Sequence, residues 1–333
     1  MSVVDRPVLE GASSLARNAA FSGFVRTGAT LEMKAFTGVT GDAGGFAVPR
    51  EIDAQIDTLL KAVSPIRAIA NVAKVGSAGY RKLVTTGGTP SGWAAENAAR
   101  PETASPVFVE IAPPTGELYA NPSASQAMLD DAAFDVEEWL AGEIAMEFAK
   151  AEGAAFVSGS GVSRPKGFLT SATAATADGV RAFGTLQYLA SGTAGDFSAS
   201  PQERLIDLVQ SLRGPYRQGA SFVMNAATLA RIRKFKTTDG AFVWAPSLAA
   251  GVPATLLGYP VVEAEDMPDI AANALAIAFG NFKAGYIIAE RTETGILRDP
   301  YSNKPFVNFY ATKRVGGCVT NSEAIKLMKF SVA

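Results

Sequence analysis

The amino-acid sequence predicts an α+β fold with about two domains. Its 333 residues are 48% hydrophobic and 19% charged, a composition typical of a chain that buries a core of its own. The helices and strands that its apolar patterns predict alternate irregularly, without the strand–helix repeat of a parallel α/β sheet. A long stretch rich in glycine and proline also separates the first elements from the clearest helix.

The first elements begin after an N-terminal arm. Residues 1–47 have weak periodicity and a glycine-rich end, which predicts an extended arm. Apolar residues recur at helical spacing from Pro49 to Leu60, and Ser64-Pro65 predicts the stop of that helix. The apolar run from Ala68 to Val75 predicts a strand.

A long hairpin is predicted next. Glycine and proline exclude a helix between residues 76 and 121. Two β-compatible segments, Lys82 to Thr86 and Pro106 to Ile111, flank a polar centre at Glu96 to Glu102. The apolar residues here are interrupted, so few of them can be buried against their own chain. Because such a loop is uncommon in a compact domain, it indicates a binding task.

The clearest element is a helix from Asp135 to about Val157. Val136, Leu140, Ile144 and Phe148 lie four apart on one stripe, and Asp135 with Glu138 forms an acidic variant of a capping box. At 1.5 Å per residue the helix is roughly 34 Å long. The segment after it, to about Ser200, is rich in Ala, Thr and Ser and has no strong pattern.

Shorter elements follow towards the C-terminus. Helices are predicted over Glu203 to Leu212 and Ala227 to Phe235. The predicted strands cover residues 221–224, 260–263, 274–279, 285–289, 295–297 and 306–315.

The composition excludes several classes of function. The chain has no histidine, which excludes histidine general bases and imidazole metal sites. Its single cysteine, Cys318, lies among apolar residues and is interpreted as a packed small side chain. A net charge of −2 is not that of a dedicated nucleic-acid binder. No apolar run is long enough for a membrane span and no signal peptide is recognised, so we expect neither membrane insertion nor secretion by that route.

Two motifs suggest enzyme chemistry and are given structural interpretations. The segment Gly159 to Gly167 resembles a phosphate loop, but Lys166 precedes glycine and Pro165 interrupts, so a tight turn is preferred. Paired acids at Asp130-Asp131, Glu137-Glu138 and Glu263/Glu265-Asp266 could serve a glycosidase only if two of them met in a cleft. No base, nucleophile and oxyanion set can be assigned. We therefore predict no catalytic, cofactor or metal site.

Charges of opposite sign are segregated along the chain. Residues 83–152 hold two basic and 12 acidic residues. Residues 203–240 hold seven basic and three acidic ones, and residues 280–333 hold eight and four. Complementary patches of this kind could attract one subunit to another. The alternative is that the charges solvate separate faces or pair within one subunit.

Nine short segments, in order, resemble the mature major capsid proteins of tailed phages of the Hong Kong 97 type. Together they span about residues 16 to 330. They are Ala16-Arg-Asn-Ala-Ala-Phe21 with Phe24 to Gly28 and Gly44 to Pro49; Ser64 to Arg67; Gly92 to Glu96; Leu129-Asp130-Asp131; Gly159-Ser160-Gly161 with Pro165-Lys166-Gly167; Val223-Met224-Asn225; Leu257 to Val261 with Met267-Pro268; Phe279 to Phe282; and Arg314 to Gly317 with Glu323-Ala324-Ile325.

The resemblance implies a particular domain organisation. An N-terminal arm (1–47) and an extended loop (76–117) accompany a peripheral domain formed from residues 48–75, 118–159 with the long spine helix, and 285–318. An axial domain covers residues 160–284, and residues 319–333 return to it. In the resembled family the extended loop lies across a neighbouring subunit. We therefore expect Trp93, Glu96, Arg100 and Glu102 to contact another subunit.

The function implied by the resemblance is that of a major capsid protein. Its subunits would assemble through hexamers and pentamers into an icosahedral-type shell in a phage, prophage or gene transfer agent particle. The implied partners are weakly contacted double-stranded DNA, a portal, and scaffold, protease or decoration proteins, with no membrane. Assembly is expected in the bacterial cytoplasm. An encapsulin-like compartment and a carboxylate-dependent enzyme are the alternatives.

Two departures from the resembled family bear on assembly. Only some fifteen residues precede the match, where many relatives carry a helical scaffold segment that a protease removes. We therefore expect either a processed or truncated form, or a scaffold that is supplied separately. Some relatives join subunits by an isopeptide bond from a lysine in the extended loop. No lysine occurs from Leu83 to Ala149, so we expect no such crosslink.

Overall fold

The computed structural model describes residues 64–76, 80–85, 91–94, 96, 100, 102–125, 129, 136–236, 255–291 and 295–332. The expected arm and the expected helix over residues 49–60 lie outside these ranges. Contacts divide the chain into two compact units. Unit 1 includes Leu118–Phe148 and Glu293–Lys313, and unit 2 comprises Lys61–Glu117, Ala149–Thr292 and Arg314–Ala333.

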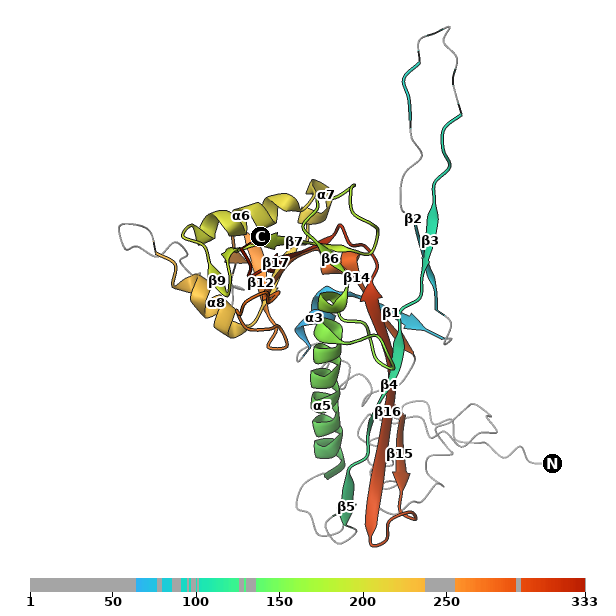
Figure 1. Cartoon of the computed structure of the whole chain (residues 1–333). Coiled ribbons are helices and arrows are strands. Elements are labelled where there is room, and N and C mark those ends of the chain that lie inside the picture. Colours follow the sequence, from blue (N-terminus) through green and yellow to red (C-terminus); the bar gives the residue numbers. More distant parts are fainter. Residues whose placement is uncertain are drawn as a thin grey trace, which may run out of the picture. The chain divides into compact units, whose positions relative to one another are not determined.

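Unit 1 contains an antiparallel sheet and the first part of a long helix (Figure 1). The strands are β4 (Thr115–Ala120), β5 (Ser123–Ser125), β15 (Gly295–Asp299) and β16 (Phe306–Val319), with β15 and β5 both paired to β16. Strands β4 and β16 each continue into unit 2. Val307 and Phe309 of β16 are buried against Leu129 and Val136, which places a small apolar core between sheet and helix.

The long helix α5 (Val136–Ser158) confirms the predicted element. Of its predicted stripe, Val136, Ile144 and Phe148 are buried and Leu140 is half-buried. The stripe forms because residues four apart lie on one face of a helix. Asp135, and with it the expected capping box, lies outside the described residues.

Among the described residues of unit 2, seven strands form a mixed sheet in the order β11-β12-β10-β13-β17-β7-β6. Helices α6 (Pro201–Ser211) and α8 (Ala226–Arg233) pack their apolar residues on Phe222 and Phe279 of this sheet. A single helical turn, α7 (Gly214–Arg217), follows α6. The strands are β6 (Thr173–Ala174), β7 (Leu186–Ala190), β10 (Ser221–Met224), β11 (Thr255–Leu256), β12 (Tyr259–Glu263), β13 (Ile277–Gly280) and β17 (Ile325–Lys329).

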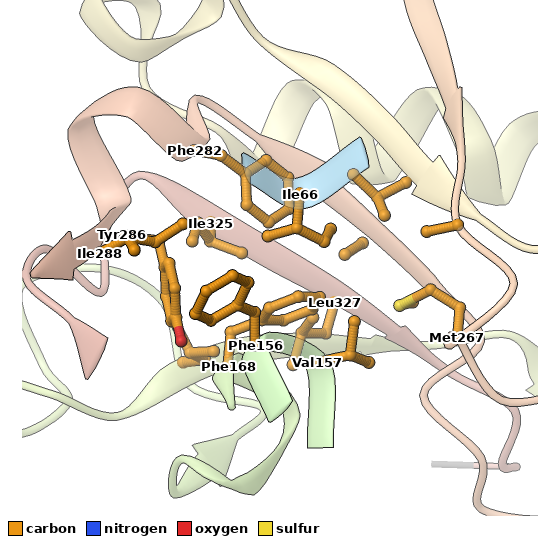
Figure 2. Close-up of a cluster of buried hydrophobic side chains, with 14 of the residues drawn as sticks. Ile66, Phe156, Val157, Phe168, Met267, Phe282, Tyr286, Ile288, Ile325 and Leu327 are labelled. Atoms are coloured by element: carbon orange, nitrogen blue, oxygen red, sulfur yellow. The ribbon is translucent and has the colours of Figure 1, made fainter. Parts of the chain in front are cut away.

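A second group of elements in unit 2 surrounds an aromatic core. Strand β1 (Asn71–Val75) pairs in parallel with β14 (Tyr286–Arg291), which pairs with the end of β16. Figure 2 shows Phe156, Phe168, Phe282 and Tyr286 gathered in this core. Phe168 and Phe282 meet edge to face, with ring centroids 5.4 Å apart. The remaining short elements are α3 (Pro65–Ile69), η2 (Phe168–Thr170), α9 (Phe282–Gly285), β8 (Gly192–Thr193) and β9 (Asp196–Phe197).

The start of the described chain corrects one prediction. The expected strand over residues 68–75 was too long, because Ala68 and Ile69 belong to helix α3 and the strand begins at Asn71. Pro65, which we interpreted only as a helix stop, occupies the first turn of α3. Proline is tolerated there because the first amides of a helix have no intrahelical acceptor.

The predicted turn after the long helix is confirmed. Ser160 and Lys166 form an isolated antiparallel bridge, and Gly161 has a φ of 80°. Gly167 donates its amide hydrogen to the Gly159 carbonyl at 2.9 Å, which brings η2 directly against the end of α5. Such close packing of two backbones leaves no room for a side chain at either glycine.

Two buried charge clusters lie in unit 2, and the sequence pattern predicted neither. The Arg67 guanidinium pairs with the carboxylates of Glu152 and Glu290 and so links α3, α5 and β14. Lys326, on the interior strand β17, is completely buried and pairs with Asp178. Charges buried at this depth require such partners.

The single cysteine behaves as predicted. Cys318 is buried on β16 opposite Ile287. Burial raises the pKa of its thiol to about 11. None of the described helices is both long and apolar enough to cross a bilayer.

Candidate assembly interface

The predicted hairpin is present as a two-stranded ribbon in unit 2 (Figure 1). Strands β2 (Lys82–Thr85) and β3 (Phe108–Ile111) pair antiparallel, with Leu83 opposite Glu110 and Thr85 opposite Phe108. An exposed ion pair between Arg81 and Glu110, 2.8 Å long, lies at its base. An isolated ribbon of two strands is marginally stable in water, so this one depends on contacts beyond its own ladder.

The two faces of the ribbon differ in exposure. Directly opposed residues share a face, so Leu83, Thr85, Phe108 and Glu110 form one face and are all exposed. Lys82, Val84, Val109 and Ile111 form the other face and are half-buried. Leu83 is 68% exposed and Phe108 61% exposed. Large apolar side chains on a solvent face of this kind mark a surface suited to a partner.

All four residues predicted to contact another subunit are exposed near the tip of this hairpin. The side chain of Trp93 is fully exposed. Glu96, Arg100 and Glu102 are exposed as well. Tryptophan and arginine are enriched at the energetically important positions of protein interfaces. Each of the four side chains is therefore accessible to a partner.

A second exposed surface lies on the sheet of unit 1. Strand β16 alternates between buried and exposed residues, so Phe306 and Tyr310 face away from Val307 and Phe309. Tyr310 pairs with Leu297 of β15, which is 52% exposed. Tyr119 on β4 and Tyr301 in the turn after β15 are also exposed. The outer face of β15 and β16 therefore combines aromatic and aliphatic side chains.

Sequence reasoning missed the outer face of unit 1. The segment Phe306-Val307-Asn308-Phe309-Tyr310 has almost no alternation of polar and apolar residues, because both faces of the strand carry large apolar side chains. Without alternation, the sequence cannot tell an exposed apolar face from a buried one. The aromatic content of the segment was the one available signal.

Among the described residues, no group of three or more carboxylate or cysteine side chains is arranged to hold a metal ion. The geometry instead offers exposed apolar and aromatic surfaces, which suit association of protein with protein. Comparison with known proteins identifies the kind of association. A model of the phage capsid family matches residues 44–330. The chain belongs to the phage capsid family.

Two solved capsid structures of GTA particles are similar to this capsid protein in both sequence and fold. It is 50% identical to a chain of the capsid of a native GTA particle computed with C5 symmetry. That match covers 89% of this chain and 95% of the other, with a TM-score of 0.75. The capsid of an empty GTA particle is 48% identical over 91% of this chain and 98% of the other, also with a TM-score of 0.75.

More distant structures share only the fold. A chain from Microbacterium phage Oxtober96 is 12% identical, with a TM-score of 0.58 over 91% of this chain and 99% of the other. The search of curated proteins found no match.

The family assignment confirms three expectations. The resemblance to capsid proteins, the α+β capsid fold with its long helix, and a role as a major capsid protein that assembles into shells are all supported. Because the family consists of structural capsid proteins, the protein is not an enzyme. The domain boundaries and the contact residues of the hairpin stay predictions.

Proposed function

We propose that this capsid protein forms hexamers and pentamers that close into an icosahedral-type shell around double-stranded DNA, in a phage-like or gene transfer agent particle. The support for this geometry comes from its relatives of about 50% identity, whose capsids were computed with C5 symmetry. Fivefold symmetry in those particles requires the contact surfaces of one subunit to be complementary to those of the next.

The main structural support for assembly is the exposed apolar face of the hairpin. A ribbon of two strands with an exposed apolar face gains stability when that face is covered. We propose that a neighbouring subunit covers it, and that Trp93, Glu96, Arg100 and Glu102 make contacts there. Trp93 supplies the largest apolar surface of the four, so its contribution to binding should be the greatest.

The remaining partners follow from the same role. The overall charge of −2 supports only weak contact with packaged DNA, since it provides no excess of positive charge to hold phosphates. A portal completes the shell, and scaffold, protease or decoration proteins act where the particle uses them. Assembly takes place in the bacterial cytoplasm, without a membrane.

The test removes the hairpin tip and, separately, its aromatic side chain. Deletion of residues 88–104 retains both strands of the ribbon, so the subunit should fold but fail to close shells. Trp93→Ala should reduce particle yield strongly, whereas Trp93→Phe, which keeps an aromatic ring, should retain most of it. Val162→Ala is the matched control, because Val162 is exposed but lies outside the hairpin.

Electron microscopy and sedimentation measure the yield of shells, and circular dichroism checks folding of each variant. Wild-type yield from the deletion, or equal loss in Trp93→Ala and Val162→Ala, would contradict the proposed role of the hairpin.

A further inference from the structure

A polar cavity of about 440 Å³ lies in unit 2 beside strand β2 of the hairpin, whose Val84 and Thr85 line part of it. Its lining includes Arg181, Arg213, Tyr216, Asn321, Ser322 and Glu323. These residues come from three places in the sequence: the segment between β6 and β7, the start of α7, and the turn between β16 and β17. Thr85 also belongs to the exposed face of the ribbon, so the cavity borders the surface that we propose a neighbouring subunit covers.

Positive charge exceeds negative charge among the side chains that line the cavity and those that pair with them directly behind its wall. The carboxylate of Asp178 pairs with Lys326 and Arg181, and its second oxygen lies 3.5 Å from Nε of Arg213. Arg213 also pairs with Glu323 at 3.1 Å. Three cationic side chains therefore share two carboxylates. The cations are Lys326, Arg181 and Arg213, and the carboxylates are those of Asp178 and Glu323. In a partly enclosed site an uncompensated positive charge favours an anionic ligand.

Only one of the three cations is accessible. The side chains of Lys326 and Arg181 are 0% and 3% exposed, and Arg181 also donates to the carbonyl oxygens of Thr185 and Ser322. The side chain of Arg213 is 49% exposed. Arg213 is thus the cation that can meet a ligand, while the other two supply fixed positive charge behind it.

Two hydroxyl groups add hydrogen-bond donors. Asn321 donates its Nδ2 hydrogen to the Tyr216 hydroxyl oxygen at 2.8 Å. The Gly184 amide donates to the Ser322 hydroxyl oxygen at 3.2 Å. In both cases the oxygen accepts, so the hydroxyl proton can be donated to a ligand. A guanidinium with two hydroxyl donors is a combination that recognises oxyanions.

We propose that this cavity binds an oxyanion, a phosphate or a carboxylate, through Arg213, Tyr216 and Ser322. Glu323 does not prevent this, because its charge is compensated by Arg213 and the site as a whole keeps a positive excess. The oxyanion has two sources: free inorganic phosphate, or a carboxylate side chain of a second copy of this chain. The acidic stretch over residues 83–152 provides many such carboxylates.

The first arm of the test uses inorganic phosphate and unassembled full-length subunits, so it does not depend on shell formation. Titration calorimetry and thermal unfolding are measured in phosphate and in chloride of equal ionic strength. Phosphate at about 100 times its dissociation constant should raise the ratio of folded to unfolded protein about 100-fold. Chloride should not reproduce this shift.

Variants locate the site. Arg213→Gln should weaken phosphate binding about tenfold to a hundredfold, since it removes a charged donor. Tyr216→Phe and Ser322→Ala should weaken it less. Arg204→Gln is the matched control: Arg204 is 47% exposed and pairs with Asp207, but it does not line the cavity. The readout is the increment that phosphate adds to each variant, so a general loss of stability does not imitate the effect.

The second arm tests the carboxylate source through assembly. If a second copy supplies the oxyanion, Arg213→Gln should lower shell yield, Arg213→Lys should restore part of it, and Arg204→Gln should leave it unchanged. Phosphate binding that is lost in Arg213→Gln supports the site even if the yield is normal, and identifies free phosphate as the source. The proposal is overturned if both arms fail. In the first arm, phosphate would either not bind or bind Arg213→Gln and Arg204→Gln equally; in the second, the two variants would give the same shell yield.

Discussion

Gly167 lies where the backbone of η2 meets the end of α5, and adding one methyl group there should strongly destabilise the subunit. A Cβ atom at this position would lie 2.3 Å from the Val157 carbonyl oxygen and 2.6 Å from the Gly159 nitrogen. Non-bonded atoms pack best at about 3.5–4.0 Å. Gly167→Ala therefore requires the two segments to separate by about 1 Å.

Such a separation breaks specific interactions. The hydrogen bond from the Gly167 amide to the Gly159 carbonyl is 2.9 Å long, and that from the Tyr286 hydroxyl to the Lys166 carbonyl is 2.8 Å. Each contributes about 0.5–1.5 kcal/mol. Strain from overpacking a close contact adds about 1–3 kcal/mol. We expect Gly167→Ala to lower the free energy of unfolding by about 2–4 kcal/mol.

Urea unfolding of unassembled subunits measures this change, and Gly142→Ala is the control. Gly142 lies within α5, where a Cβ atom would meet nothing within 4 Å. Alanine there should raise the free energy of unfolding by about 0.5–1 kcal/mol, because it favours the helix. A Gly167→Ala subunit as stable as the wild type would refute the reasoning from close contact.

Four other predictions concern reactivity, pH and assembly. Cys318, with its pKa raised to about 11 by burial, should react with a thiol reagent at pH 8 far more slowly in the folded subunit than in urea. Burial and the charge of Glu265 raise the pKa of Asp266 in the folded state. The protonated form is favoured there, so the stability of the wild type relative to Asp266→Asn should fall as pH rises through the raised pKa; equal pH profiles in urea unfolding would contradict this. Assembly of isolated capsomers, followed by light scattering, should weaken as salt rises if the acidic stretch over residues 83–152 meets basic segments of neighbours, because exposed charges are screened beyond about 8 Å. Mature particles should run as single subunits on denaturing gels, since no lysine occurs from Leu83 to Ala149; a ladder that survives boiling would disprove it.

The sequence predicted the elements whose patterns are local. The stripe in α5 was recognised because its residues are four apart, and β10 was recognised from a short apolar run. The hairpin strands were found because glycine and proline excluded a helix between residues 76 and 121. In these cases the period or the turn residues alone determine the structure.

Other elements depended on distant partners. Strand β7 lies in the Ala, Thr and Ser-rich segment that has no pattern of its own, and it forms by pairing with β17. Strand β17 carries the buried Lys326 as its second residue, and a lysine there argues against a core strand until Asp178 is known to pair with it. The polar cavity around Arg213 was equally hidden, because its residues converge only in the folded chain.

The position of β17 also affects the order in which the protein can fold during synthesis. This strand lies between β13 and β7, and its residues 326–329 pair with residues 187–190. It is translated after every other strand of its sheet, so on the ribosome β7 and β13 lack the neighbour that they share until β17 emerges. Contacts between residues so far apart in sequence form slowly. A nascent subunit therefore cannot present a completed sheet to other subunits, which separates synthesis from shell assembly in time.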